Sequence, residues 1–189
     1  VIACEDQSLL VADKSGNRIY RINQDRQIEF VLNGTRSQNG FYDAKQMYSG
    51  EDGSIYLLDV RRTGSRKMEQ ERILKYDRNG KMVQVVSDIR YDENERVYRI
   101  DGLDGKIVWF QFTGDGFSIM SQDGELRHFP YEEAEQYLVD FAINPATGFC
   151  AYLTKSGEIY EEQENGSFRK VYSADDSNLQ IPWYIDYSL

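Results

Sequence analysis

Residues Ser54–Asp59 read SIYLLD, a short run that is apolar on both faces and follows the glycine-containing turn Ser49–Gly53. The run recurs in similar form as Ser8–Asp13 (SLLVAD), Lys106–Gln111 (KIVWFQ) and Phe149–Thr154 (FCAYLT). The copies are spaced by about 45 residues, a period that indicates stacked supersecondary units. The chain holds 14 Tyr and 9 Phe against 3 Pro, a composition that suits pleated surfaces better than helices. Each unit is therefore predicted to consist of strands.

The second repeat shows the predicted unit most completely. Strands are expected at Ala44–Tyr48, Ile55–Val60, Arg72–Tyr76 and Met82–Val86. A polar loop at Arg61–Glu71 is expected to join the second strand to the third. The turn Asp77–Gly80 ends in Asn-Gly, which supplies the positive φ that a tight hairpin needs. One repeat is therefore predicted to be four antiparallel strands.

The other repeats follow the same pattern. The predicted units span residues 1–32, 44–86, 96–129 and 137–172, and Trp183–Tyr187 is expected to begin a further strand. Four-stranded units at this period are typical of a β-propeller. The expected fold class is therefore all-β, a β-propeller of four-stranded antiparallel blades, with about four blades in a single domain or segment. Three alternatives stay open for the ring: a segment of a larger propeller, a closed four-bladed ring, or completion by a second copy in a homodimer.

Two stretches of the second repeat carry a resemblance to known proteins. Asp52–Asp59 (DGSIYLLD) and Ile73–Gly80 (ILKYDRNG) resemble the blades of the NHL and YncE-like propeller families. The resemblance covers nearly the whole chain and implies the fold, whereas it says little about activity. The third repeat departs from the pattern, because its inner strand lacks the small residue and the terminal Asp. No catalytic signature of the family's enzymes is present.

The charge of the chain narrows the range of partners. Its 189 residues carry a formal net charge of −10 at pH 7, which opposes the basic footprint of a nucleic-acid binder. An anionic membrane surface is disfavoured for the same reason, and no apolar run is long enough to insert into a bilayer. The chain opens at Val1 without an initiator Met or a leader, so we expect a piece of a longer protein. An extracytoplasmic or cell-surface location is expected.

Ligands are expected at the face where the second-to-third-strand loops gather with the connectors between blades. The loop Val60–Lys67 carries Arg61, Arg62 and Arg66, and guanidinium groups suit carboxylate, phosphate or sulfate groups. One interpretation of this pattern is an anion-binding or partner-docking loop. The alternative is a solvated insertion whose charges balance Glu69 and Glu71.

Three further residues are candidates for ligand contacts. Arg36 and Tyr42 lie in the connector between the first and second units, and Trp109 lies on the inner strand of the third. Such side chains stack on a sugar or on a peptide side chain. The alternative is that these aromatic residues fill the wedge between blades.

The residues typical of catalysis and metal binding are sparse. Cys4 and Cys150 match no metal spacing and are expected to be buried thiols, with a disulfide between them as the alternative. His128 is the single histidine, and no partner can be assigned to it from spacing. No metal or cofactor is therefore expected.

The favoured function is a non-catalytic ligand- or protein-binding propeller, the sensor or recognition part of a larger bacterial signalling or surface protein. Its expected partner is a protein, peptide or carbohydrate ligand at the loop face. One alternative is a metal-dependent enzyme similar to the lactonase-like propellers, with Asp13, Asp59 and Asn144 as candidate metal ligands. The other is a structural interaction scaffold.

Overall fold

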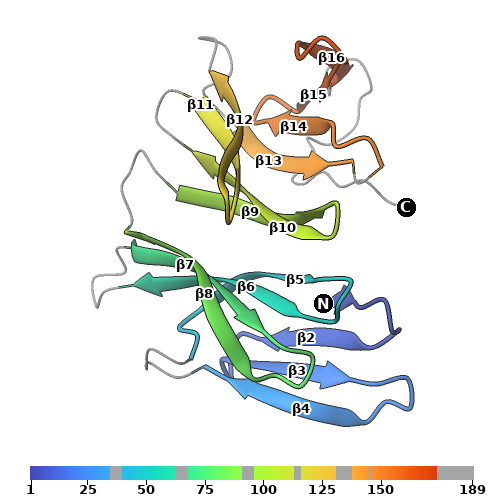
Figure 1. Ribbon diagram of the computed structural model, residues 1–189, viewed down its shortest axis with the longest axis vertical. Coiled ribbons are helices and arrows are strands. Elements are labelled where there is room, and N and C mark those ends of the chain that lie inside the picture. Colours follow the sequence, from blue (N-terminus) through green and yellow to red (C-terminus); the bar gives the residue numbers. More distant parts are fainter. Residues whose placement is uncertain are drawn as a thin grey trace. The chain divides into compact units, whose positions relative to one another are not determined.

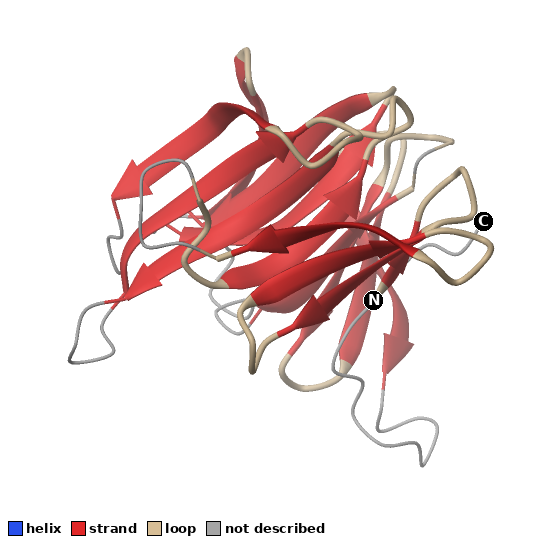
Figure 2. Cartoon of the chain, turned by 90° about the horizontal axis from the view of Figure 1, so that it is seen from below, coloured by secondary structure: helices blue, strands red, loops and turns tan. Residues whose placement is uncertain are grey.

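The computed structural model describes residues 1–34, 40–62, 68–90, 96–112, 116–130, 138–144 and 146–173. Within these ranges the chain forms strands joined by turns and contains no helix (Figure 2). The strands form four antiparallel four-stranded sheets, and within each sheet the strands pair in the order in which they follow one another in sequence (Figure 1). The all-β prediction is therefore confirmed.

The first sheet contains β1 (Ile2–Ala3), β2 (Leu9–Asp13), β3 (Arg18–Ile22) and β4 (Ile28–Asn33). The second contains β5 (Ala44–Ser49), β6 (Ile55–Arg62), β7 (Met68–Tyr76) and β8 (Met82–Arg90). The third contains β9 (Arg96–Leu103), β10 (Lys106–Phe112), β11 (Gly116–Ser121) and β12 (Gly124–Pro130). The fourth contains β13 (Leu138–Ile143), β14 (Cys150–Thr154), β15 (Glu158–Glu162) and β16 (Phe168–Ser173). The expected strand at Trp183–Tyr187 lies outside the described residues.

The predicted loop at Arg61–Glu71 is wrong over much of its length. β6 continues through Arg62 and β7 begins at Met68, and the two strands pair Arg61 with Gln70 and Arg62 with Met68. Both arginines are exposed, so the ladder continues here without burying its side chains. The polar side chains of this segment led to the prediction of a loop, but the backbone hydrogen bonds between β6 and β7 continue here.

The turn between β7 and β8 has the predicted conformation. Gly80 has a φ of 80°, in the left-handed region that favours glycine. A Cβ at this position would also lie 2.9 Å from the side chains of Phe30 and Leu32 on β4. The glycine therefore serves both the tight turn and the close approach of this turn to the first sheet.

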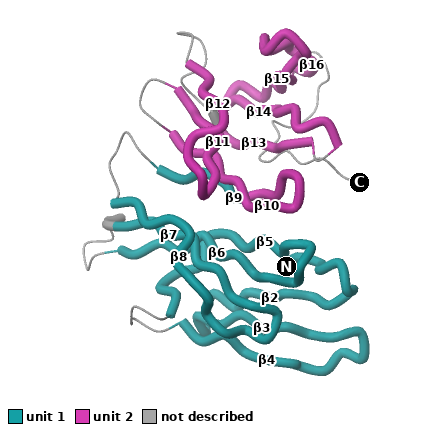
Figure 3. Tube along the Cα trace, in the orientation of Figure 1, with its two compact units in different colours: residues 1–100 teal, residues 101–189 magenta. Residues whose placement is uncertain are grey.

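The described structure divides into two compact units, residues 1–100 and residues 101–189 (Figure 3). In unit 1 the core lies between the first and second sheets, where Leu10 and Ile19 pack with Ile55, Leu57 and Leu74. Each of these five side chains is fully buried. The alternation of strand side chains places one face of each sheet in this core.

The core of unit 2 is aromatic. Phe117 on β11 lies 4.3 Å from Phe141 and 4.7 Å from Phe129, measured between ring centroids. Phe110 stacks on Phe141 at 5.0 Å, and Tyr152 meets Phe117 edge-on at 5.9 Å. Offset and edge-to-face contacts of this kind add to the burial of the rings. These aromatic contacts join the third sheet to the fourth within unit 2.

Candidate functional site

Three of the predicted ligand-binding residues lie together in unit 1. Tyr42 precedes β5, while Arg61 and Arg62 end β6. The Arg61 guanidinium carbon lies 5.4 Å from the centroid of the Tyr42 ring, and Arg62 Nε lies 3.8 Å from an Asp43 carboxylate oxygen. We refer to Tyr42, Arg61 and Arg62 as the Arg–Tyr surface. Arg36 and Arg66 lie outside the described residues.

A buried ion pair contacts the residues of the Arg–Tyr surface. Arg72 on β7 is directly opposite Asp59 on β6, and its Nε donates to Asp59 Oδ2 at 3.1 Å. The same guanidinium donates to the carbonyl oxygen of Gly40 at 2.9 Å and lies 4.8 Å from the Tyr42 ring centroid. Asp59 Oδ1 accepts hydrogen bonds from the backbone N–H groups of Tyr42 (2.6 Å) and Asp43 (2.9 Å). The ion pair therefore fixes the segment that carries Tyr42.

The electrostatics of this ion pair are set by its burial. The Asp59 side chain is fully buried and the Arg72 side chain is only 6% exposed. Burial raises the pKa of Asp59 above its ordinary value, and the hydrogen bonds from Arg72 and from the two backbone N–H groups oppose that rise. Arg61 and Arg62, by contrast, are exposed, and Tyr42 is half-buried. The surface thus presents two exposed guanidinium groups, of which Arg62 is paired with Asp43, and guanidinium groups pair with carboxylate, phosphate or sulfate.

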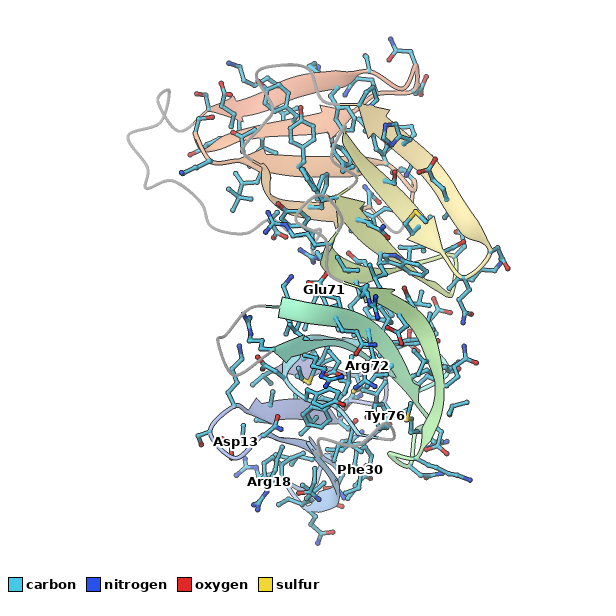
Figure 4. The ribbon with its side chains drawn as sticks, turned by 90° about the vertical axis from the view of Figure 1, so that its left-hand side faces the viewer. Asp13, Arg18, Phe30, Glu71, Arg72 and Tyr76 are labelled. Atoms are coloured by element: carbon cyan, nitrogen blue, oxygen red, sulfur yellow. The ribbon has the colours of Figure 1, made fainter. Side chains whose placement is uncertain are left out.

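Glu71, which the alternative interpretation pairs with the basic loop, is a buried residue with partners outside that loop, and Arg66 lies outside the described residues. The Glu71 side chain is fully buried, and Oε2 accepts a hydrogen bond from the backbone N–H of Val97 at 2.5 Å. Lys45 Nζ lies 3.7 Å from Oε1. Figure 4 shows Glu71 on one side of β7 and Arg72 and Tyr76 on the other, as expected for alternating strand positions.

Trp109 belongs to unit 2 and is 5% exposed. Its indole N–H donates to Gln111 Oε1 at 3.3 Å, and on the ladder it faces Met120. A ligand would meet little of this ring. The burial supports the packing interpretation, and a ligand contact by Trp109 stays a prediction.

The candidate metal ligands each have other partners. Asp13 accepts hydrogen bonds from its own turn, at Ser15 and Gly16. Asp59 is paired with Arg72, and Asn144 Oδ1 accepts from backbone N–H groups of the following turn. Among the described residues, no group of three or more His, Cys, Asp or Glu side chains is placed to hold a metal ion.

His128 has partners that spacing did not reveal. Ser118 on β11 is opposite His128 on β12, and Ser118 Oγ lies 2.9 Å from His128 Nδ1. The same hydroxyl donates to Glu125 at 2.7 Å. Ser118 is fully buried, and its proton is given to the carboxylate. The hydroxyl therefore links His128 to Glu125.

The two cysteines are buried free thiols, as the favoured interpretation predicted. Near Cys150 the sequence analysis missed an ion pair, in which both Glu162 carboxylate oxygens accept from Arg127 Nη1, at 2.7 and 2.8 Å. Arg127 Nη2 lies 3.3 Å from Cys150 Sγ, and Glu162 Oε2 accepts from the Cys150 backbone N–H at 2.9 Å. Arg127 and Glu162 lie 35 residues apart, so no local pattern could have paired them.

Cavities lie against the turns of both units. In unit 2 a cavity of about 560 Å³ lies against the turns β13–β14 and β15–β16. In unit 1 two cavities of about 300 and 280 Å³ share Asp6, Arg21 and Arg78 in their walls. The sequence analysis did not single out these turns, because it read them only as strand connections.

Comparison with solved structures identifies the class of fold. The chain is similar to a streptogramin B lyase (TM-score 0.57, 15% identity, 89% of this chain and 52% of that chain). It is also similar to virginiamycin B lyase from Staphylococcus aureus (TM-score 0.58, 13% identity, 89% and 53%) and to a protein of unknown function from Bacteroides caccae (TM-score 0.56, 16% identity, 88% and 58%). The chain therefore spans between about half and three fifths of the length of these proteins.

These likenesses and the four consecutive four-stranded sheets define the chain as a β-propeller protein, which confirms the predicted fold class. At these identities the likeness shows the fold alone. No family model matches the sequence, and no curated protein matches it. In the described residues no helix is long and apolar enough to cross a membrane.

Proposed function

We propose that this chain is the recognition part of a larger bacterial signalling or surface protein and binds an anionic group of its partner at the Arg–Tyr surface. One observation carries this proposal: exposed Arg61 lies against the half-buried Tyr42 ring, and the buried Asp59–Arg72 ion pair holds the segment that carries Tyr42. A surface held in place before binding loses little conformational entropy when a ligand arrives. Loops on a rigid scaffold are common binding sites.

The finer class that the sequence suggests is consistent with this role. The stretches DGSIYLLD and ILKYDRNG resemble the blades of NHL and YncE-like propellers, and we place the chain in that group as a proposal. A net charge of −10 disfavours a long polyanion such as nucleic acid, so the proposed partner is a protein, a peptide or a carbohydrate that presents a local anionic group to Arg61 and Arg62. We also propose an extracytoplasmic or cell-surface location, which protease accessibility in intact cells would test.

Calorimetric titration of the whole chain tests the proposed anion binding. The probes are a hexaglutamate peptide, a heparin-derived sulfated hexasaccharide and duplex DNA, each at low and physiological salt. Arg61→Ala combined with Arg62→Ala should weaken binding of the peptide or the hexasaccharide by at least about tenfold, because hydrogen bonds to charged groups contribute roughly 1.5–3 kcal/mol each.

The matched control is Lys81→Ala combined with Lys106→Ala, which removes two exposed cations elsewhere. This variant should bind like the unmodified chain. Equal losses in both double variants would mean that only the net charge matters. Binding to neither the peptide nor the hexasaccharide would overturn the proposal, and so would a preference for DNA.

Catalysis is the second candidate, and the two lyases with a similar fold are the observation that favours it. The proposal of a non-catalytic role is therefore best tested directly. Metal analysis of the purified chain is the first step. A stoichiometric, tightly held divalent ion that supports turnover of a lactone substrate would favour the enzyme and overturn the non-catalytic role.

A further inference from the structure

A cavity lies in unit 2 at the strand ends where the first strand of the fourth sheet turns into the second and the third into the fourth. It is formed where the turn between β13 and β14 faces the turn between β15 and β16. Its volume of about 560 Å³ falls within the roughly 300–1,000 Å³ of small-molecule sites. Asn144, Phe149, Gln163, Asn165 and Arg169 are among the residues that line it. We call it the Asn–Phe pocket.

The two asparagines of the pocket have their carbonyl oxygens already engaged. Asn144 Oδ1 accepts hydrogen bonds from the backbone N–H groups of Ala146 at 2.9 Å and Thr147 at 3.3 Å. Asn165 Oδ1 accepts from the backbone N–H of Ser167 at 3.0 Å and from its hydroxyl at 2.7 Å. These turn contacts fix both side chains and leave their amide NH₂ groups as hydrogen-bond donors.

Acceptors complement these donors. Gln163 Nε2 donates to the backbone carbonyl oxygen of Glu161 at 3.1 Å, so Gln163 Oε1 is left as an acceptor. Glu162 also lines the pocket, but its carboxylate is taken up by Arg127 and by the Cys150 backbone N–H. Glu162 therefore makes a rigid wall of the pocket and adds little net charge.

One aromatic ring completes the pocket. Phe149 is half-buried, and among the described residues it makes no ring contact, whereas Phe117, Phe141 and Tyr152 pack on one another. A half-buried ring that lines the pocket beside oriented amide donors and acceptors matches a ligand that has both C–H faces and hydroxyl groups. The carboxylates of Glu161 and Glu164 against the single guanidinium of Arg169 disfavour a phosphorylated or sulfated ligand.

We propose that the Asn–Phe pocket binds a neutral oligosaccharide. Phe149 supplies the stacking surface, Asn144 and Asn165 donate to sugar hydroxyl oxygens, and Gln163 accepts from a sugar hydroxyl. The site lies in the other unit from the Arg–Tyr surface. The two proposals therefore stand or fall separately.

Titration of the whole chain with neutral hexasaccharides tests the pocket. The probes are cellohexaose, xylohexaose, maltohexaose and N-acetylchitohexaose. Binding of each is measured by calorimetry and by NMR. At least one should bind. Phe149→Leu keeps the apolar bulk and removes the ring, and it should weaken binding by about two- to twelvefold, because stacking of aromatic rings is worth roughly 0.5–1.5 kcal/mol beyond the buried area.

Asn165→Asp gives the sharper result. The carboxylate still accepts the turn hydrogen bonds from Ser167, so the fold is kept while the NH₂ donor is lost. Binding should fall at least about fivefold, as for loss of a hydrogen bond with an unpaired polar group left behind. Asn23→Asp is the matched control, because Asn23 Oδ1 accepts from the Gln27 backbone N–H at 2.9 Å in the comparable turn between β3 and β4.

The control variant and Arg61→Ala with Arg62→Ala should both bind the sugar like the unmodified chain. Failure of all four hexasaccharides to bind would overturn the proposal. So would sugar binding that survives both Phe149→Leu and Asn165→Asp, or a peptide probe such as hexaglutamate that occupies the pocket in place of sugar.

Discussion

Asp59 and Arg72 face each other across the ladder between β6 and β7, and their ion pair fixes the segment from Gly40 to Asp43. Each partner does more than neutralise the other. Asp59 accepts two backbone N–H groups of this segment, and Arg72 donates to its carbonyl group at Gly40. The position of Tyr42, and with it the Arg–Tyr surface, therefore depends on one buried pair of charges.

Asp59→Asn is expected to destabilise unit 1 strongly. The change leaves the Arg72 guanidinium, only 6% exposed, without a countercharge. Breaking a buried ion pair in this way costs about 3–5 kcal/mol, because the remaining charge stays out of water. Urea unfolding measures the loss as a change in the free energy of unfolding.

Asp43→Asn is the control for this prediction. Asp43 pairs with Arg62 at 3.8 Å, and both side chains are about half exposed, at 52% and 48%. An exposed ion pair contributes only about 0–1 kcal/mol. If Asp59→Asn cost no more than Asp43→Asn, the buried pair would not be what holds the connecting segment.

The sequence predicted Asp59 as a feature of the repeat but not its partner. Strands and turns follow from local patterns, and the Asn-Gly turn at Gly80 and the apolar run at Ile55 are set by neighbouring residues. The pairing of Asp59 with Arg72 depends on the register of β6 and β7, and the expected loop over Arg61–Glu71 concealed that register. The Asn–Phe pocket needs two turns brought together from separate hairpins, which no spacing in the sequence encodes.

Glu71 should make stability fall as the pH rises. Burial raises the pKa of Glu71 above its ordinary value of 4.5, and the nearby Lys45 only partly opposes this. Between 4.5 and the raised value, the folded chain keeps a proton that the unfolded chain has lost. The free energy of unfolding therefore decreases through this window as the pH rises, and it levels off above the folded pKa.

Urea unfolding of the unmodified chain and of Glu71→Gln at several pH values between 4 and 8 isolates this effect, because the variant has no proton to exchange. The stability of the variant relative to the unmodified chain should rise with pH. Glu158→Gln is the opposite control, since hydrogen bonding by Lys170 lowers the pKa of Glu158, so that its stabilising contribution is fully present above the ordinary value of 4.5 and is lost as the pH falls towards the lowered pKa. Parallel curves for the chain and Glu71→Gln would contradict the prediction.

Phe117→Ala should be among the most destabilising changes in unit 2. The ring is 2% exposed and contacts Phe129, Phe141, Tyr152 and Phe168. Removing it leaves a cavity among four aromatic rings, and Phe→Ala changes in cores cost about 3–5 kcal/mol. Denaturant unfolding followed by near-ultraviolet circular dichroism reports directly on these rings.

Leu126→Ala is the control for the aromatic core, because Leu126 is 48% exposed on β12. Surface changes of this type stay within about 0.5 kcal/mol. Similar losses for Phe117→Ala and Leu126→Ala would mean that the aromatic cluster is not the core of unit 2.

The Cys150 thiol should be inert in the folded protein, even though a guanidinium lies beside it. Arg127 at 3.3 Å favours the thiolate, but burial outweighs it and raises the pKa of Cys150 to about 12. Only the thiolate attacks disulfide reagents, so at pH 8 both its low population and its burial suppress the reaction. Cys4 is also buried, at 7% exposed. The native chain should therefore react very slowly with Ellman's reagent, and both thiols should react in 6 M guanidinium.

Gln122→Cys places a thiol in the exposed turn between β11 and β12, and its rapid reaction would show that the reagent is active. A fast native reaction that persists in Cys4→Ser would assign a reactive thiolate to Cys150, and it would mean that Arg127 governs this site more than burial does.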